Sequence, residues 1–210
     1  MIKENHIQVT RAARYYTIGE INGSTQKIWF VLHGYGQLAG DFIELFEQVV
    51  DNNAFIIAPE GLSRFYQEGG YGKVGANWMT KEDRENEISD YVNYLDELYK
   101  QIISTHHIEQ VKINALGFSQ GAATLSRWAE LGKSKLNKLI FWAGELAKDV
   151  EYKAIKENEI HLVFGNNDTI FPGEFYKTQE ELLDKFGVKY NTHIFEGGHE
   201  VNHKILLQFK

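Results

Sequence analysis

The chain has 210 residues, of which 43% are hydrophobic and 24% are charged, and its formal net charge is -7 at pH 7. A chain of this length can bury a sizeable core, and we expect one domain over residues 1–210. The negative charge argues against a nucleic-acid-binding protein, because no basic stripe is present to neutralise phosphates.

The sequence also lacks cysteine and any obvious targeting segment. The absence of cysteine excludes disulfides, thiolate metal sites and cysteine nucleophiles. Residues 1–6 lack the apolar core of a signal peptide, and no apolar run approaches the length of a transmembrane helix. We therefore expect a cytoplasmic protein without a membrane span.

Short apolar runs bounded by turn residues predict the strands in chain order. Residues 6–10 and 15–20 are predicted to form an N-terminal antiparallel hairpin. The later runs are β-branched or continuously apolar, as is typical of strands covered on both faces. These predicted strands are residues 27–32, 54–59, 111–116, 138–143, 160–164 and 188–195.

Apolar residues at helical spacing predict helices between these strands. The first contains Phe42, Leu45 and Phe46 on one face. Residues 80–83 read as a capping box that opens a long helix. The later helices are predicted after Ser119 to about residue 131, from Pro172 to about residue 186, and through Leu206. Strands that alternate with helices predict an α/β fold with a mostly parallel central sheet and helices on both faces.

Residues 62–79 differ from the rest of the chain. Four glycines stand among aromatic residues, and the stretch shows no clear periodicity. A long loop inside a compact domain is usually functional, so a lid or a pocket wall is one interpretation. A surface excursion without a role is the other.

The most informative motif is Gly117-Phe-Ser-Gln-Gly121, which matches G-x-S-x-G and lies between a predicted strand and a predicted helix. In that context Ser119 would occupy a strained turn that exposes its hydroxyl, and small neighbours would let the strand and helix approach closely. The backbone N–H of Gln120, at the helix N-terminus, would then face any oxyanion formed there.

A serine nucleophile needs an imidazole to take its proton and a carboxylate to orient that imidazole. The chain supplies Ser119, Asp168 and His199 in that order, each after a predicted strand. In a parallel sheet the carboxyl ends of the strands share one edge, so we expect the three to meet. We assign the second oxyanion donor to the backbone N–H of Tyr35, with Gln37 as the fallback.

The chain resembles α/β-hydrolases of the carboxylesterase, phospholipase and acyl-protein thioesterase group. The motifs that carry the resemblance are His33-Gly-Tyr-Gly36, Ala58-Pro-Glu-Gly61, Gly117-Phe-Ser-Gln-Gly121, Gly165-Asn-Asn-Asp168 and Gly197-Gly-His199. The resemblance implies an α/β-hydrolase fold and hydrolysis of a small-molecule carboxylic ester or thioester through a Ser-Asp-His triad, without a cofactor. Residues 62–79 do not resemble the acyl-binding region of the lipid thioesterases, which favours short to medium acyl groups. An acyl-thioesterase or a lysophospholipase with the same triad is the alternative.

Several residues allow a second interpretation. Glu145 follows the strand before Asp168 and is a competing acid for His199. Tyr35, Trp78 and Phe171 either line the substrate pocket or pack in the core. His33 precedes a glycine turn and is expected to make structural hydrogen bonds rather than act as a second base.

Two other classes of function remain possible. His199-Glu-Val-Asn-His203 matches the zinc-peptidase motif H-E-x-x-H, in which Glu200 would be the base. A catalytic zinc needs a third protein ligand, and none of the seven residues after His203 is His, Asp or Glu. The second class is a hydrolase-fold protein that binds a ligand without cleaving it.

Overall fold

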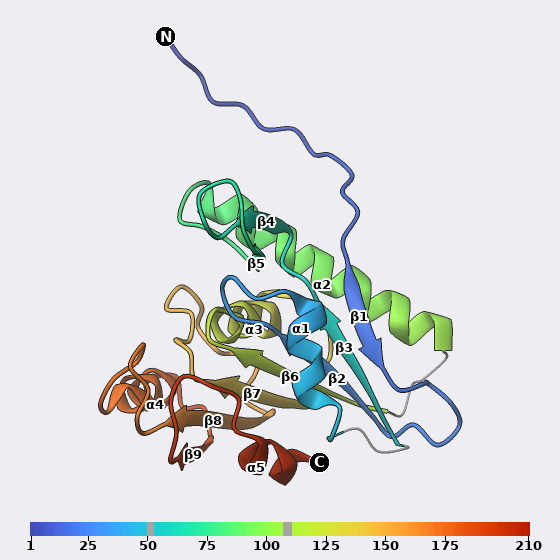
Figure 1. The fold of residues 1–210 in the computed structure, drawn as a ribbon, viewed down its shortest axis with the longest axis vertical. Coiled ribbons are helices and arrows are strands. Elements are labelled where there is room, and N and C mark those ends of the chain that lie inside the picture. Colours follow the sequence, from blue (N-terminus) through green and yellow to red (C-terminus); the bar gives the residue numbers. More distant parts are fainter. Residues whose placement is uncertain (50–52, 107–110) are drawn as a thin grey trace.

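The computed structural model describes residues 1–49, 53–106 and 111–210 and contains a seven-stranded sheet (Figure 1). The strand order is β1-β3-β2-β6-β7-β8-β9, and every neighbouring pair is parallel except β1 with β3. The sheet strands are β1 (Tyr15–Ile18), β2 (Lys27–Leu32), β3 (Ala54–Pro59), β6 (Lys112–Phe118), β7 (Lys138–Trp142), β8 (Glu159–Gly165) and β9 (Asn191–Phe195). The predicted α/β fold with a mostly parallel sheet is confirmed.

Helices cover both faces of the sheet, because the inner strands are apolar on both sides (Figure 1). On one face, Phe30 and Leu162 pack with α2 (Arg84–His106), α3 (Gln120–Leu131) and α4 (Phe175–Lys185). On the other face, Val31 and Val163 pack with α1 (Ala39–Ile43), α5 (His203–Leu206) and the 3-10 turns η1 (Glu44–Phe46) and η2 (Leu207–Phe209).

The strand order places four of the connecting loops at one edge of the sheet. β2 continues into α1 on one face, whereas its neighbour β6 continues into α3 on the other face. Ligands of open α/β sheets bind at such a switch point, beyond the carboxyl ends of the strands. The turn after β2 and the turn after β6 are therefore adjacent, and the loops after β8 and β9 lie at the same edge.

The N-terminal strand is antiparallel, as predicted, but its partner is different. β1 pairs with β3, with Tyr15 opposite Pro59, and residues 6–10 form neither helix nor strand. The prediction that residues 6–10 pair with β1 is wrong, because β3 offers β1 a fully buried apolar partner strand instead.

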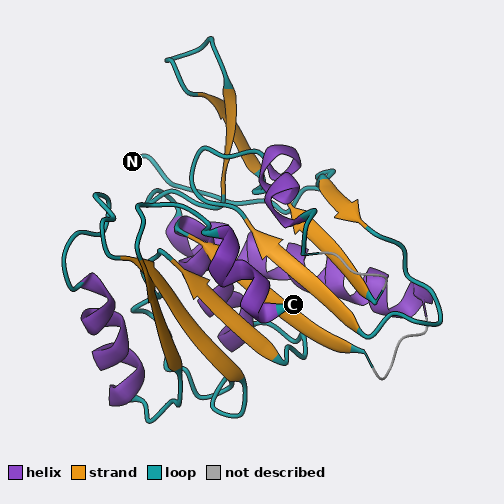
Figure 2. Ribbon diagram, turned by 60° about the horizontal axis from the view of Figure 1, so that its bottom comes forward, coloured by secondary structure: helices purple, strands orange, loops and turns teal. Residues whose placement is uncertain are grey.

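Residues 62–79 do not form an irregular loop. They contain a separate two-stranded antiparallel hairpin of β4 (Ser63–Tyr66) and β5 (Val74–Asn77). Figure 2 shows this hairpin projecting from the body at the top of the view. Its glycines and its exposed aromatic residues hide the alternation by which a strand is normally recognised.

Two predicted helix starts are also corrected. α2 begins at Arg84, because Asp83 has φ 47 and cannot continue the helix toward Thr80. The Glu87 carboxylate accepts the Thr80 N–H, so no capping box forms over residues 80–83. α4 begins at Phe175, with Glu174 as the N-cap, and Pro172 lies before it.

Candidate active site

Ser119 occupies a sharp turn between β6 and α3, with φ 54 and ψ -117. Such a conformation is strained for a residue with a side chain and marks functional sites. The two glycines of the motif make the turn possible, since a Cβ on Gly117 would lie 2.2 Å from the Gly121 carbonyl oxygen. A Cβ on Gly121 would lie 2.3 Å from the Leu32 carbonyl oxygen. Both positions therefore require glycine for close backbone approach.

The structure brings Ser119, His199 and Asp168 into one hydrogen-bonded chain. His199 Nε2 lies 2.9 Å from Ser119 Oγ, and His199 Nδ1 lies 2.7 Å from Asp168 Oδ2. The Asp168 side chain is 1% exposed and that of His199 is 20% exposed. A buried carboxylate on Nδ1 holds the Nδ1–H tautomer, which leaves Nε2 free to accept the serine proton.

Backbone groups hold the Asp168 carboxylate in place. Its second oxygen, Oδ1, accepts the N–H groups of Ile170 at 2.8 Å and Phe171 at 3.0 Å. The carboxylate is thus fully engaged, with one oxygen on the backbone and the other on the imidazole. These bonds fix the orientation of the carboxylate toward the imidazole of His199.

The loops that carry Asp168 and His199 are joined to each other. Asn166 N–H donates to Phe195 O at 2.9 Å, and Asn167 N–H donates to Gly197 O at 2.9 Å. The loops approach so closely that a Cβ on Gly165 would lie 2.4 Å from the Gly197 carbonyl oxygen. These contacts fix the acid relative to the imidazole across the ends of β8 and β9.

The turn after β2 lies directly against Ser119. A Cβ on Gly34 would lie 3.1 Å from the Ser119 Cβ. Within the described part of the chain, the Tyr35 N–H has no protein acceptor. The Gln37 N–H instead donates to Gly34 O at 3.3 Å, and Gln37 Oε1 accepts the Gly34 N–H at 2.7 Å. Of the two candidate donors, only the Gln37 N–H is engaged with a protein acceptor in the described ranges.

Gln120 contributes two separate groups. As the first residue of α3, it has a backbone N–H that no carbonyl within the helix accepts. Its side chain reaches the end of the hairpin, where Nε2 donates to Asn77 Oδ1 at 2.6 Å and to Met79 O at 3.0 Å, and Oε1 accepts the Trp78 N–H at 3.3 Å. The sequence predicted the backbone N–H of Gln120 as an oxyanion donor. Nothing in the local sequence signals the side-chain hydrogen bonds of Gln120 or the contribution of Asn77.

His33 is fully buried beneath the same turn. Its Nδ1–H donates to Gly34 O at 2.7 Å, and its Nε2 accepts the Gly61 N–H at 3.0 Å. Burial lowers the pKa of His33, which favours the neutral ring that this pattern of one donor and one acceptor requires. The expected structural hydrogen bonds of His33 are present.

The three aromatic candidates for the substrate pocket occupy different environments. Phe171 is half-buried, 5.7 Å from the His199 ring between centroids, and stacks on Phe175. Tyr35 lies in the turn after β2, next to Ser119, and is 61% exposed. Trp78 is only 2% exposed, stacks on His33 and donates from Nε1 to His33 O at 2.9 Å. Trp78 therefore packs in the core, and the pocket-wall interpretation is left to Tyr35 and Phe171.

The alternative acid does not reach His199. Glu145 forms an ion pair with Lys148, and its side chain is 45% exposed. Asp168 occupies the place beside the imidazole Nδ1 instead.

The zinc-peptidase geometry is not formed. α5 begins at His203, so His199 and His203 do not lie one turn apart on a single helix. Both ring nitrogens of His199 are engaged, with Asp168 and with Ser119. Glu200 and His203 are exposed.

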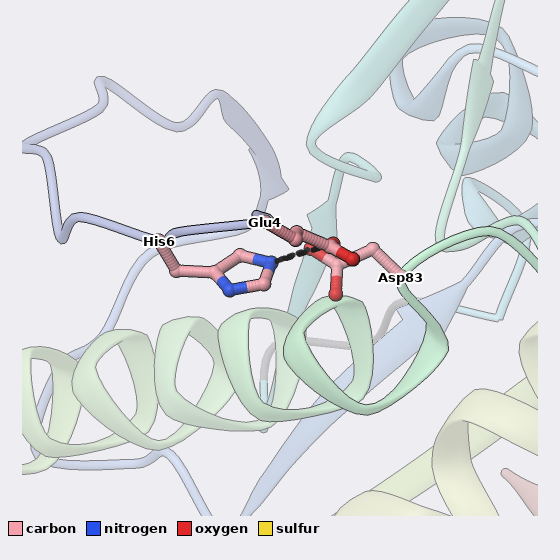
Figure 3. A group of neighbouring side chains, drawn as sticks. All are labelled: Glu4, His6 and Asp83. Atoms are coloured by element: carbon pink, nitrogen blue, oxygen red, sulfur yellow. Dashed lines mark ion pairs between the residues drawn. The ribbon is translucent and has the colours of Figure 1, made fainter. Parts of the chain in front are cut away.

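One group of side chains in the described ranges has the spacing of a metal site. It consists of Glu4, His6 and Asp83, which link the N-terminal segment to the start of α2 (Figure 3). His6 Nε2 lies 3.3 Å from a carboxylate oxygen of each acid, and all three residues are exposed. This cluster shares no residue with the candidate active site.

None of the helices in the described part of the chain is long and apolar enough to cross a membrane.

Comparison with solved structures gives the same fold. The esterase PE8 has 19% sequence identity and a TM-score of 0.71, with 94% of this chain and 95% of that chain covered. The Zea mays acyl-protein thioesterase 2 has 17% identity and a TM-score of 0.71, with 94% and 98% covered. The Bacillus cereus carboxylesterase has 16% identity and a TM-score of 0.71, with 94% and 91% covered. At these identities the likeness establishes the α/β-hydrolase fold.

A search of curated proteins finds no match to the chain. The model of the phospholipase/carboxylesterase family matches residues 15–210, which include the turn after β2, the turn that carries Ser119 and both loops that carry Asp168 and His199. The chain therefore belongs to the phospholipase/carboxylesterase family.

Proposed function

We propose that the protein is a serine hydrolase that cleaves carboxylic esters through an acyl-enzyme. The observation that carries the proposal is the hydrogen-bonded chain from Ser119 Oγ through His199 to the buried Asp168. Among the described residues, the backbone N–H groups of Tyr35 and Gln120 have no protein acceptor, and both residues lie next to this chain of bonds.

In the first half-reaction, Ser119 Oγ attacks the carbonyl carbon of the ester while His199 Nε2 takes the hydroxyl proton. The carbonyl oxygen becomes an oxyanion, which the N–H groups of Tyr35 and Gln120 stabilise. When the tetrahedral intermediate collapses, the bond to the leaving oxygen breaks and His199 gives its proton to the departing alcohol. The acyl group remains on Ser119.

In the second half-reaction, water attacks the acyl carbonyl and His199 Nε2 accepts a proton from that water. Collapse of the second intermediate releases the carboxylic acid, and the proton returns to Ser119 Oγ. Asp168 stays ionised throughout, orients the imidazole and stabilises the imidazolium. No residue outside Ser119, His199, Asp168 and the two donors is needed for these steps.

We propose short to medium acyl groups as the substrate class, because residues 62–79 depart from the acyl-binding region expected in lipid thioesterases. A thioesterase or lysophospholipase would use the same groups, since the triad acts on the carbonyl carbon and not on the leaving atom. We also propose a cytoplasmic location and a small-molecule substrate.

Turnover of p-nitrophenyl esters of graded acyl length tests the proposal. We expect the wild type to favour the shorter esters, Ser119→Ala to be folded and inactive, and a chelator to leave the wild type unaffected. Preference for the long esters would instead favour the lysophospholipase or thioesterase alternative. Turnover by Ser119→Ala would refute the mechanism, and binding of esters without turnover would favour a non-catalytic role.

A further inference from the structure

The hairpin β4–β5 touches every residue of the turn 35–37. The ring of Phe65 lies 5.1 Å from the ring of Tyr35 between centroids. Gln67 Nε2 donates to Gly36 O at 2.6 Å, and the Gly36 N–H donates to Ala76 O at 2.9 Å. The Ala76 N–H donates to Gln37 O at 3.2 Å. The turn is therefore hydrogen-bonded to β5 and to Gln67, which directly follows β4, and it packs against Phe65 of β4.

The backbones of the turn and the hairpin are also in close contact. A Cβ on Gly75 would lie 2.5 Å from the Gly36 carbonyl oxygen and 2.7 Å from the Gly36 Cα. Gly75 does not have a positive φ, so its glycine serves close approach and not backbone freedom. A side chain at position 75 would push the turn away.

The base of the hairpin is itself anchored to the body. Arg64 Nε donates to the buried carboxylate of Glu60 at 2.6 Å. At the other strand, the Gln120 side chain holds Asn77 and Met79. The hairpin is thus fixed at one end to the residue after the nucleophile, while its strands hold the turn that carries the other oxyanion donor.

We propose that the β4–β5 hairpin positions the Tyr35 N–H for the oxyanion, with Gln67 and Gly75 as positioning residues. This inference rests on the proposed function. Tyr35 is exposed, and the peptide that carries its N–H is held from below by the bond from His33 to Gly34 O. Figure 2 shows the hairpin projecting from the body, and the bonds to Glu60 and Gln120 hold its base. Its contacts with the turn therefore align the donor, and loss of that alignment weakens binding of the oxyanion but not of the substrate.

The test uses two variants that act on different contacts. Gly75→Ala displaces the turn, and we expect kcat to fall about 100-fold with an unchanged KM, as for loss of one oxyanion donor. Gln67→Met keeps the length of the side chain and removes its donor. Because this bond is exposed, we expect a kcat loss of about 3- to 10-fold. Gln67→Lys restores a donor on an unbranched side chain and should recover most of kcat.

Tyr71→Ser at the exposed tip of the hairpin is the matched control and should behave as the wild type. Each kcat is expressed per fluorophosphonate-labelled Ser119. Partial unfolding of a variant is then not counted as a loss of kcat. A trifluoromethyl ketone, which forms a tetrahedral adduct with the serine, should bind more weakly to Gly75→Ala by the same factor as kcat falls.

The outcomes separate the two proposals. If Gly75→Ala and Gln67→Met keep the wild-type kcat per labelled serine, or if only KM rises, the positioning role is wrong while the serine mechanism stands. If the wild type neither takes the label nor turns over esters, the proposed function and this inference fall together.

Discussion

The imidazole of His33 donates from Nδ1 to the carbonyl oxygen of Gly34 at 2.7 Å, directly beneath the turn that faces Ser119. In a trans peptide the carbonyl and the next N–H point in opposite directions. A hydrogen bond that fixes Gly34 O therefore also fixes the direction of the Tyr35 N–H. The Gly61 N–H on Nε2 ensures that Nδ1 is the donor.

Replacing His33 by Phe should lower kcat about 10-fold or more while KM stays near the wild-type value. The aromatic ring can still stack on Trp78, but the Gly34–Tyr35 peptide loses its fixed orientation. Steady-state kinetics on a short p-nitrophenyl ester measures the effect, with the exposed His203→Phe as control. An unchanged kcat in His33→Phe would show that the peptide needs no such support.

His33 should also make stability depend on pH. Burial lowers the pKa of His33 from its ordinary value of 6.5, so below that pH the unfolded chain binds a proton that the folded protein does not. The free energy of unfolding must then fall as the pH drops from about 6.5 toward the folded pKa, by up to about 1.4 kcal/mol per pH unit. Urea unfolding at about pH 7.5 and about pH 5.5 should show a smaller loss in His33→Phe. Equal losses in both proteins would contradict the buried neutral ring.

Asp168→Asn should abolish most activity without disturbing the fold. The amide oxygen can still accept the N–H groups of Ile170 and Phe171, but the amide N–H would donate to His199 Nδ1 and force the proton onto Nε2. Nε2 could then no longer accept the proton of Ser119. We expect kcat to fall by about 10⁴, the cost of the equivalent change in other serine triads, with an unchanged melting temperature. Near-normal turnover would mean that another group orients His199.

We expect the buried carboxylate of Glu60, at the base of the hairpin, to contribute strongly to the stability of the fold. Its buried carboxylate accepts bonds from Arg64, from Arg14 and from the Ala39 N–H. Burial opposes ionisation, but these bonds prevail and lower the pKa of Glu60 below 4.5. Glu60→Gln should therefore lower the free energy of unfolding by about 2 kcal/mol at neutral pH.

The pH dependence of Glu60→Gln provides a second check. A lowered folded pKa stabilises the protein fully above about pH 4.5, and this contribution is lost as the pH falls through the folded value. The difference in urea midpoint between wild type and Glu60→Gln should therefore shrink in acid. The exposed Glu68→Gln should change stability by less than about 0.5 kcal/mol at any pH. A constant difference would mean that Glu60 is not ionised in the folded protein.

The inner strands of the sheet could be predicted because each is a short apolar run between turn residues. The same reasoning could not find the partner of β1, because the choice between residues 6–10 and β3 depends on which surface is buried in three dimensions. It also missed the β4–β5 hairpin. The residues of β4 alternate only between half-buried and exposed, so hydrophobicity carries little signal there.

The candidate site, like the fold, could be predicted from the sequence only in part. The order Ser119, Asp168, His199 at strand ends could be read from the sequence, because the carboxyl ends of parallel strands share an edge; their catalytic roles stay predictions. The burial of Trp78 and the bonds from Gln120 to Asn77 and Met79 could not be read, because they join segments far apart in the chain. No local pattern encodes such contacts.

The most direct test of the account is the site of covalent labelling by a fluorophosphonate. This reagent reacts with a serine only when an imidazole accepts its proton and an oxyanion pocket holds the phosphonyl oxygen. We predict a single label on Ser119, found by mass spectrometry of the peptide that joins β6 to α3, and no label in Ser119→Ala. Labelling of another residue, or a folded wild type that takes no label, would contradict the proposal that Ser119, His199 and Asp168 work as one catalytic unit.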